Sequence, residues 1–492
     1  MTAGFERMHR HAAVPLLLTG IFLGSRLVFY LAGVRFDMTP LTGQIKMFQL
    51  LDLHQLQHNL VQSIWYLQSQ PPLFNLVSGL LLKLPTVAIR PTLVVASLVL
   101  GLGLVLTSYY LALELHVPRL VSFVLAVVVV LDPANVLYGN WYFYSFPTAV
   151  ALTFAALCLA RHVRTGSLPS GLGFFGSLMS VVLLNSTFQW FWLVIAAAPL
   201  VIVLRRRRRS WQAMLAMAAV PLLLVSLWYV KNAVLFHTYS TSSWAGMNLS
   251  KVARGLAPPD QLAKLIAEKR VSPVSRIGPF EPVSAYGPNF DSHPVTGVVV
   301  LDQRTKGDGT PNFNNINYIR ISNQLLHDDL VYIRAYPGTY AHNVSRAAIL
   351  FFVPPEQYNF VEPNSRHLSE FLNTFDRYVA WEPRPTAIAT NSFAAAQVTF
   401  GQVSIGSVIM FSIVLLAIPF MVWRRRSDAP WALTLTFIWM STAYVLALTT
   451  LVEYGENERF RYDLGPLPLI AAVAVVVALL KRRPVEPKDP AT

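Results

Sequence analysis

Apolar runs that match the thickness of a hydrocarbon core, about 30 Å or about 20 helical residues, recur along this chain. The run that follows the basic N-terminus is long for a signal peptide and has no small-residue cleavage site after it, so a retained first helix is expected. The pattern predicts ten membrane-spanning helices, at residues 13–32, 92–113, 119–137, 143–160, 171–186, 188–204, 213–235, 401–423, 430–451 and 463–480. The expected fold is therefore an all-α polytopic membrane protein.

Three stretches depart from the spanning pattern. The apolar piece at 71–87 is short, opens with Pro71-Pro72 and carries Lys83, which favours a half-inserted or interfacial helix. Residues 38–69 mix apolar and polar positions at helical spacing, which predicts one or two amphipathic helices along the interface. Residues 236–400 are too long for a linker, so a small mixed domain is expected there, with a helical region from about 321 to 352.

Composition supports the membrane interpretation. Hydrophobic residues make up 54% of the 492 residues and charged residues only 13%, about half of what soluble domains carry. The net charge of +14 gathers in short clusters that directly follow apolar runs, which are Arg161 with Arg164, 205–209, 424–426 and 481–483. Positive-inside anchoring explains these clusters better than nucleic-acid binding does. The single cysteine, Cys158, lies in an apolar run and has no partner for a disulfide.

Orientation follows from the basic clusters. If they and the N-terminus are cytoplasmic, residues 33–70 and 236–400 lie outside, and 71–87 does not cross. Three parts result: an N-terminal membrane module at 1–235, an extracytoplasmic domain at 236–400, and a C-terminal membrane module with a cytoplasmic tail at 401–492. The expected location is the plasma membrane, with the lipid bilayer as the surrounding partner.

Polar residues with candidate chemistry collect on the expected outer side. Asp37 lies between two apolar residues at the interface, and Asp52 lies within an amphipathic stretch. Either carboxylate suits a general base. Arg459 and Arg461 run against the positive-inside trend and suit a bidentate phosphate site, although simple snorkelling to the headgroups is the alternative. Lys231, at the outer end of its helix, has the same two interpretations.

The order of these features resembles the C-type membrane glycosyltransferases (GT-C), such as protein mannosyltransferases and lipid A aminoarabinose transferases. An acid follows the first helix, Gln70-Pro71-Pro72-Leu73-Phe74 is similar to their Pro-Pro-Leu turn, and 457–462 is similar to their Asn-Arg-Tyr/Phe-Arg signature before a proline-containing helix. The stretch 132–144 resembles their Pro-x-x-x-x-Tyr region. The resemblance covers about 13–235 and 401–480 but not the segment between them.

This resemblance implies inverting transfer of a sugar from a polyprenyl-phosphate donor to an acceptor hydroxyl on a glycan, lipid or protein outside the cytoplasm. It implies Asp37 as base with Asp52 as second acid, and Arg459 and Arg461 as ligands of the donor phosphate. The set of substrate-binding residues is completed by Lys231, Gln70 and Tyr462. Where the family often has Asp-Glu, this chain has Asp37-Met38. No metal-ligand cluster is evident, and a requirement for a divalent cation stays open.

Two alternatives come from other classes. A transporter or flippase of lipid-linked glycans would need polar sites near the membrane midplane, and most of the expected spans contain no deep charge. A non-catalytic membrane scaffold would use the 236–400 segment to bind a partner. Turnover of a labelled donor separates the enzyme from both.

Overall fold

The computed structural model describes residues 2–206, 211–381 and 403–481. Its N-terminal helices are α1 (Thr2–Leu31), α2 (Thr39–Thr42), α3 (Leu53–His58), α4 (Leu60–Trp65), α5 (Pro72–Leu81), α6 (Thr86–Glu114), α7 (Arg119–Leu131), α8 (Pro133–Gly139), α9 (Ser145–Thr165), α10 (Leu168–Leu184), α11 (Trp190–Arg206) and α12 (Trp211–Phe236). The C-terminal helices are α20 (Ile405–Ser412), a π-helical turn η8 (Ile413–Ala417), α21 (Ile418–Arg424), α22 (Ala429–Val452), α23 (Asn457–Tyr462) and α24 (Leu467–Leu480).

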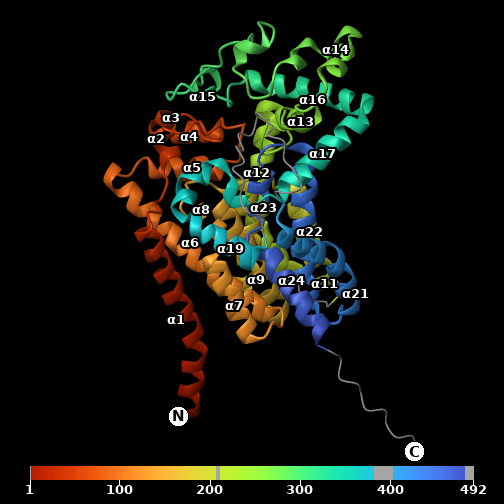
Figure 1. Ribbon diagram of the computed structural model, residues 1–492. Coiled ribbons are helices and arrows are strands. Elements are labelled where there is room, and N and C mark those ends of the chain that lie inside the picture. Colours follow the sequence, from red (N-terminus) through yellow and green to blue (C-terminus); the bar gives the residue numbers. More distant parts are fainter. Residues whose placement is uncertain (1, 207–210, 382–402, 482–492) are drawn as a thin grey trace, which may run out of the picture.

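Between these parts lie shorter elements: α13 (Ala245–Ala253), α14 (Pro259–Ala267), η1 (Pro273–Arg276), η2 (Val283–Tyr286), α15 (Val299–Asp302), α16 (Asn317–Ala335), α17 (Pro337–Phe351), η3 (Pro355–Gln357), η4 (Asn359–Val361), α18 (Glu362–Ser365), η5 (Arg366–Leu368), α19 (Ser369–Phe375) and the π-helical η6 (Asp376–Ala380). Figure 1 shows α14, α15 and α16 as a layer at one end of a helix bundle, here called the upper end. Helix α1 begins and α24 ends at the opposite, lower end.

The bundle confirms a multi-pass helical membrane protein. Among the described residues, six helices are long and apolar enough to cross a membrane, and a seventh crossing forms if α7 and α8 are one bent span. Helices α10, α11 and α24, which match three of the ten expected spans, are apolar but shorter. The count of ten therefore stays a prediction that rests on these three helices.

Two local features follow from proline chemistry. The expected span at 119–137 is wrong as a straight helix, because α7 and α8 meet at a 50° bend. Pro133 lacks an N–H, and Asp132 instead caps α8 by accepting a hydrogen bond from the Ala134 N–H at 2.9 Å. Helix α5 starts at the second of two prolines and has only 10 residues, about 15 Å of rise, so it is too short to cross.

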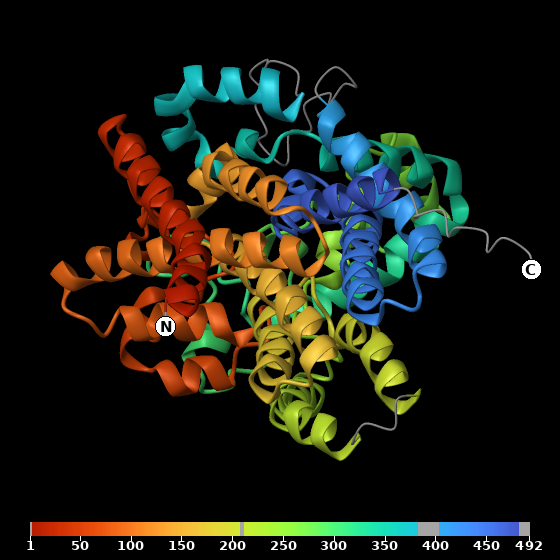
Figure 2. The same ribbon diagram turned by 90° about the horizontal axis from the view of Figure 1, so that it is seen from below.

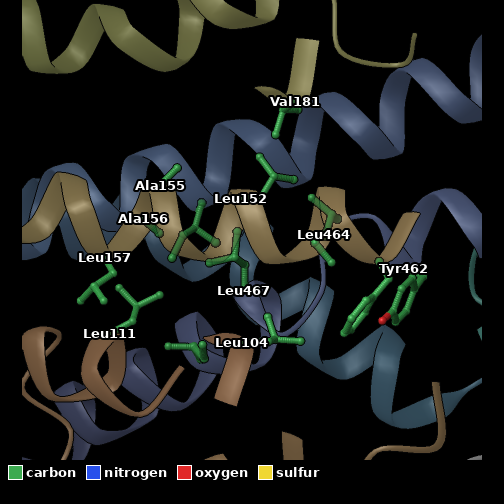
Figure 3. Close-up of a cluster of buried hydrophobic side chains, with 14 of the residues drawn as sticks. Leu104, Leu111, Leu152, Ala155, Ala156, Leu157, Val181, Tyr462, Leu464 and Leu467 are labelled. Atoms are coloured by element: carbon green, nitrogen blue, oxygen red, sulfur yellow. The ribbon is translucent and has the colours of Figure 1, made fainter. Parts of the chain in front are cut away.

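The core of the bundle lies where α6, α9 and α10 meet the start of α24. Figure 3 shows leucine side chains of α6 and α9 facing Leu464 and Leu467. Small residues let the helices approach closely in lipid, where packing rather than water exclusion favours association, and Ala155 and Ala156 of α9 are fully buried here. This contact fixes the chain just after α23, the segment that carries the two candidate arginines.

The segment after α12 divides between two places. The upper layer has its own aromatic core, in which Trp244, Phe313 and Tyr318 are buried. Its helices α16 and α17 confirm the helical region expected at 321–352. Within the described part of 236–400 there are helices, loops and one isolated bridge, Thr305 with Pro311, but no strand, so the strand content of a mixed domain is not found.

Residues 362–380 lie beside α1 instead. Asn364 exchanges two hydrogen bonds with the backbone of Arg35, at 3.0 and 2.9 Å, and the rings of Phe371 and Phe29 are 5.2 Å apart. Figure 2, seen from the lower end, shows α1 at the edge of the bundle. The expected boundary at residue 400, the first two residues of the span at 401–423, and 207–209 of one basic cluster fall outside the described residues.

We expect the upper end to face outside and the lower end to face the cytoplasm, because the basic clusters follow helices that end at the lower end. Ser292 and Ser427 are exposed at the two ends, and the native Cys158 is buried. A membrane-impermeant thiol reagent should label Ser292→Cys in intact cells and Ser427→Cys only after permeabilisation. The reverse labelling would invert the assigned orientation.

Candidate functional site

A cavity of about 220 Å³ lies at the upper end of the bundle, below α13 and above α23. Its walls come from widely separated parts of the chain and combine charged, amide and aromatic side chains. They are Lys46, Met47, Phe48, Gln49, Gln70, Trp141, Phe143, Tyr144, Ser186, Trp244, Asn248, Lys251, Phe280, Tyr358, Asn359, Phe360, Glu453, Glu456, Arg459 and Phe460. We call this the charged cavity.

Arg459 is almost completely buried at the floor of the charged cavity. Its guanidinium forms an ion pair with Glu456 at 2.5 Å and lies over the ring of Phe460, 4.2 Å from the ring centre. Its Nε–H is buried and has no hydrogen-bond partner among the described residues. A buried donor left unpaired is costly, so this group is available to an anionic ligand.

A second ion pair crosses the same cavity. Lys251 of α13 donates to Glu453, the residue after α22, at 2.6 Å, and both side chains are buried. Burial raises the pKa of Glu453 to about 7, although Lys251 opposes the shift. Burial would also raise the pKa of Glu456, but Arg459 and then Lys251 lower it below its usual value. The two carboxylates therefore differ in charge near neutral pH.

Gln70 reaches this cavity through a set of hydrogen bonds that fixes the preceding residues. The side-chain oxygen of Asn314 accepts from the backbone N–H groups of Gln68 and Ser69, at 2.9 and 3.1 Å. Ser242 donates to the carbonyl of Ser69 at 2.6 Å. The asparagine-rich run at 312–317 thus positions the Pro-Pro turn and Gln70.

Asp37 lies beside the charged cavity rather than among its lining residues. Its backbone pairs with the residues on either side of Trp141, which is a lining residue: Asp37 N–H donates to the carbonyl of Asn140 at 2.7 Å, and Tyr142 N–H donates to the carbonyl of Asp37 at 2.9 Å. Its Oδ1 accepts from both the N–H and the hydroxyl of Thr39, at 2.9 and 2.7 Å. Across residues 2–206, 211–381 and 403–481, nothing donates to its Oδ2. One oxygen is held and the other is free, as a proton acceptor requires.

Asp52 and Lys231 lie away from this cavity, and each has a structural role. Asp52 caps α3 through Gln55 N–H at 3.1 Å and accepts from Gly307 N–H at 2.6 Å, so it joins the first loop to the upper layer. Lys231 donates to the carbonyl of Leu67 at 2.6 Å and lies over the ring of Trp228. Neither residue lines the charged cavity.

Arg459 and Arg461, which the resemblance implies as joint ligands of the donor phosphate, do not line the same cavity. Residues 457–462 form the short helix α23, in which residues two apart point about 200° from one another. Arg461 therefore points to the other side, where it donates to the carbonyl of Val353 at 3.1 Å. Tyr462 donates to Asn135 at 3.0 Å and stacks on Tyr138.

Arg461 and Tyr462 line a second cavity of about 230 Å³ between α7, η6, α20 and α24. Apolar side chains form most of its walls: Val128, Val129, Phe375, Val379, Met410, Phe411 and Leu469. Its polar groups, which include Asp132, Asn135 and Glu356, gather near Arg461. We call this the apolar cavity.

Sequence reasoning missed Lys251, Lys46 and Asn248, because nothing local sets them apart from other polar residues of the upper segment. Within the described residues there is no cluster of three or more His, Cys, Asp or Glu side chains placed to hold a metal ion.

Neither models of known protein families nor curated proteins give a match to this chain.

Proposed function

We propose that this chain is a GT-C-type membrane glycosyltransferase that moves a sugar from a polyprenyl-phosphate-linked donor to an acceptor hydroxyl at the outer membrane surface. The observation that carries the proposal is the charged cavity itself. It joins Gln70 of the Pro-Pro turn with Arg459 of the C-terminal signature, and Asp37 pairs with the backbone on either side of Trp141, one of its lining residues. Those segments are the ones that resemble the GT-C enzymes.

The charges of the cavity suit a phosphodiester. Three cationic side chains (Lys46, Lys251 and Arg459) face two carboxylates (Glu453 and Glu456), which leaves one positive charge in excess when both acids are ionised. A donor diester carries one negative charge. The buried cations Arg459 and Lys251 stabilise the second charge that develops on the leaving phosphate.

The remaining walls suit a sugar. The aromatic rings of Trp141, Tyr144 and Tyr358 line the cavity, while Asn248 and Asn359 offer amide donors and acceptors. Ligand sites commonly combine aromatic walls with a few placed polar groups. The apolar cavity on the other side of α23 is the proposed place for part of the lipid chain, with Arg461 near its polar end.

The proposed reaction needs one base. The free Oδ2 of Asp37 takes the proton of the acceptor hydroxyl as the acceptor oxygen bonds to the anomeric carbon. The bond between that carbon and the phosphate oxygen breaks, and polyprenyl phosphate leaves with the electron pair. Attack from the side opposite the phosphate inverts the anomeric centre. Thr39 holds the carboxylate in place through Oδ1.

Purified protein in proteoliposomes, with a donor labelled separately in its sugar and its lipid, tests this proposal. A transferase separates the two labels and releases polyprenyl phosphate when an acceptor is present. Movement of intact donor between leaflets would instead show a transporter. If the labels stay together and the donor does not move, the non-catalytic scaffold is the remaining alternative.

Donor binding should strengthen as pH falls through about 7. The pKa of Glu453 is raised, so its negative charge is present above about pH 7 and is lost below it. Protonation removes a charge that repels phosphate and frees Lys251 from its ion pair. The donor is a diester and does not titrate in this range. Dissociation constants measured on both sides of neutrality should therefore differ in the original chain, whereas Glu453→Gln should remove the difference. An unchanged pH dependence in Glu453→Gln would contradict this role.

A further inference from the structure

A third cavity, of about 530 Å³, lies between α1, α6 and the α7–α8 bend, apart from the charged cavity. It is lined by Leu23, Arg26, Leu27, Phe29, Tyr30, Val34, Arg35, Phe36, Arg90, Val94, Ser97, Leu98, Gly101, Asn135, Gly139, Asn140 and Phe146. Apart from its three arginines the lining contains no charged residue. We call this the arginine cavity.

The three arginines converge from three places in the chain, and backbone carbonyls hold them there. Arg26 lies near the upper end of α1 and donates to Val130 at 3.2 Å. Arg90, in the second turn of α6, donates to Phe36 at 3.2 Å. Arg35 follows α1 and donates to Val34 at 3.0 Å, with its guanidinium over the ring of Tyr30.

Among the described residues, these arginines have no acidic partner in contact. Within residues 2–206, 211–381 and 403–481, no carboxylate lies within ion-pair distance of any of the three. Asp132 and Tyr462 interact with Arg26 electrostatically, without forming an ion pair with it. Three guanidinium groups around one space repel one another, so the cavity favours an anion.

The open side of the arginine cavity is expected to face lipid. Leu23 and Leu27 on its rim are 49% and 59% exposed, and only 17% of the apolar window of α1 is buried within the protein. Arg26 lies about five residues, or about 8 Å, below the end of α1. At this depth its guanidinium is placed to contact a lipid headgroup rather than the membrane midplane. Apolar residues below the arginines, such as Val94 and Leu98, are placed to contact acyl chains.

We propose that the arginine cavity binds an anionic phospholipid of the bilayer, with the headgroup phosphate on Arg26, Arg35 and Arg90 and an acyl chain along α1 and α6. Snorkelling alone would leave each arginine in water or among headgroups at random. Here all three line one cavity, and none of its lining residues is acidic. The site lies outside the charged cavity, so it does not depend on the proposed transferase reaction.

Native mass spectrometry of the full chain in neutral detergent can test this site. The probes are phosphatidylglycerol, diacylglycerol with the same chains, polyprenyl phosphate and inorganic phosphate. We expect phosphatidylglycerol to bind at least about tenfold more tightly than diacylglycerol, because several charged hydrogen bonds are formed. The double variant Arg35→Gln/Arg90→Gln should lose that preference. Arg35→Lys/Arg90→Lys should keep part of it, because lysine retains the charge but not the fork.

The control is Arg276→Gln, an exposed arginine of η1 in the upper layer, which should bind phosphatidylglycerol as the original chain does. Equal binding of diacylglycerol would overturn the proposal, as would an unchanged preference in a folded Gln or Lys double variant. Tighter binding of polyprenyl phosphate that the Gln variant abolishes would assign the cavity to the lipid-linked substrate instead. Inorganic phosphate that binds as well as phosphatidylglycerol would show a plain anion site and also overturn the lipid assignment.

Discussion

Asp37→Asn is expected to slow sugar transfer by about 10²–10⁴-fold, the usual cost of losing a general base, with little change in the yield of folded protein. Asparagine has nearly the same shape, and its amide oxygen can still accept from Thr39 as Oδ1 does now. The other position becomes an N–H₂ group, which cannot take a proton from the acceptor. Transfer rates at saturating donor and acceptor measure the effect.

Asp52→Asn is the matched control for that substitution. It changes the same functional group on the same loop, but Asp52 is occupied by Gln55 and Gly307. We expect a loss of thermal stability there, with the rate per folded molecule nearly retained. A normal rate in Asp37→Asn together with a large loss in folded Asp52→Asn would transfer the role of base to Asp52.

Arg459→Gln should have two effects that can be separated. Donor binding or transfer should weaken by roughly tenfold or more, because a charged hydrogen bond to phosphate contributes about 1.5–3 kcal/mol. Stability should also fall, by about 3–5 kcal/mol at most, because Glu456 is left in a shielded position without its partner. The double variant Arg459→Gln/Glu456→Gln removes the stranded charge, so stability should recover while donor binding does not.

Two further variants sharpen this test. Arg459→Lys should restore donor binding only in part, since lysine keeps the charge but loses the bidentate fork. Arg366→Gln is the control, because Arg366 also pairs with a glutamate, Glu362 at 2.7 Å, but on an exposed surface and outside the cavity lining. Unchanged donor kinetics in every folded Arg459 variant would remove Arg459 from the donor site.

Local patterns in the sequence were sufficient to predict most of the helices. Length and hydropathy located the long spans, and two prolines with a short apolar run identified α5 as a helix too short to cross. The bend at Asp132-Pro133 was a missed consequence of the same chemistry. Apolar character continued to residue 137, and it masked the break that the proline imposes.

The site was only partly predictable, because its contacts join residues far apart in sequence. Gln70 and Arg459 do line one cavity. Lys251 and Glu453, however, are separated by 202 positions, and no local pattern predicts their ion pair. The divergence of Arg459 and Arg461 depended on whether six residues between two spans were extended or helical. A segment that short gives too few positions for a periodicity to show.

Single polar residues at the interface were the hardest to interpret. Asp52 and Lys231 looked like functional groups because charge there is costly, yet each satisfies backbone groups that would otherwise be unpaired. A capping carboxylate and a catalytic one share the same sequence context. Only the number of hydrogen bonds on each oxygen distinguishes them, and among the described residues nothing donates to Oδ2 of Asp37.

The structure of this protein with polyprenyl phosphate bound is the most direct test of the charged cavity as a lipid-phosphate site. We expect a phosphate oxygen at hydrogen-bond distance, about 2.7–3.2 Å, from the guanidinium of Arg459 or the Nζ of Lys251, with the lipid chain leading toward the apolar cavity. A phosphate held only by Arg26, Arg35 and Arg90, with the charged cavity empty, would contradict it.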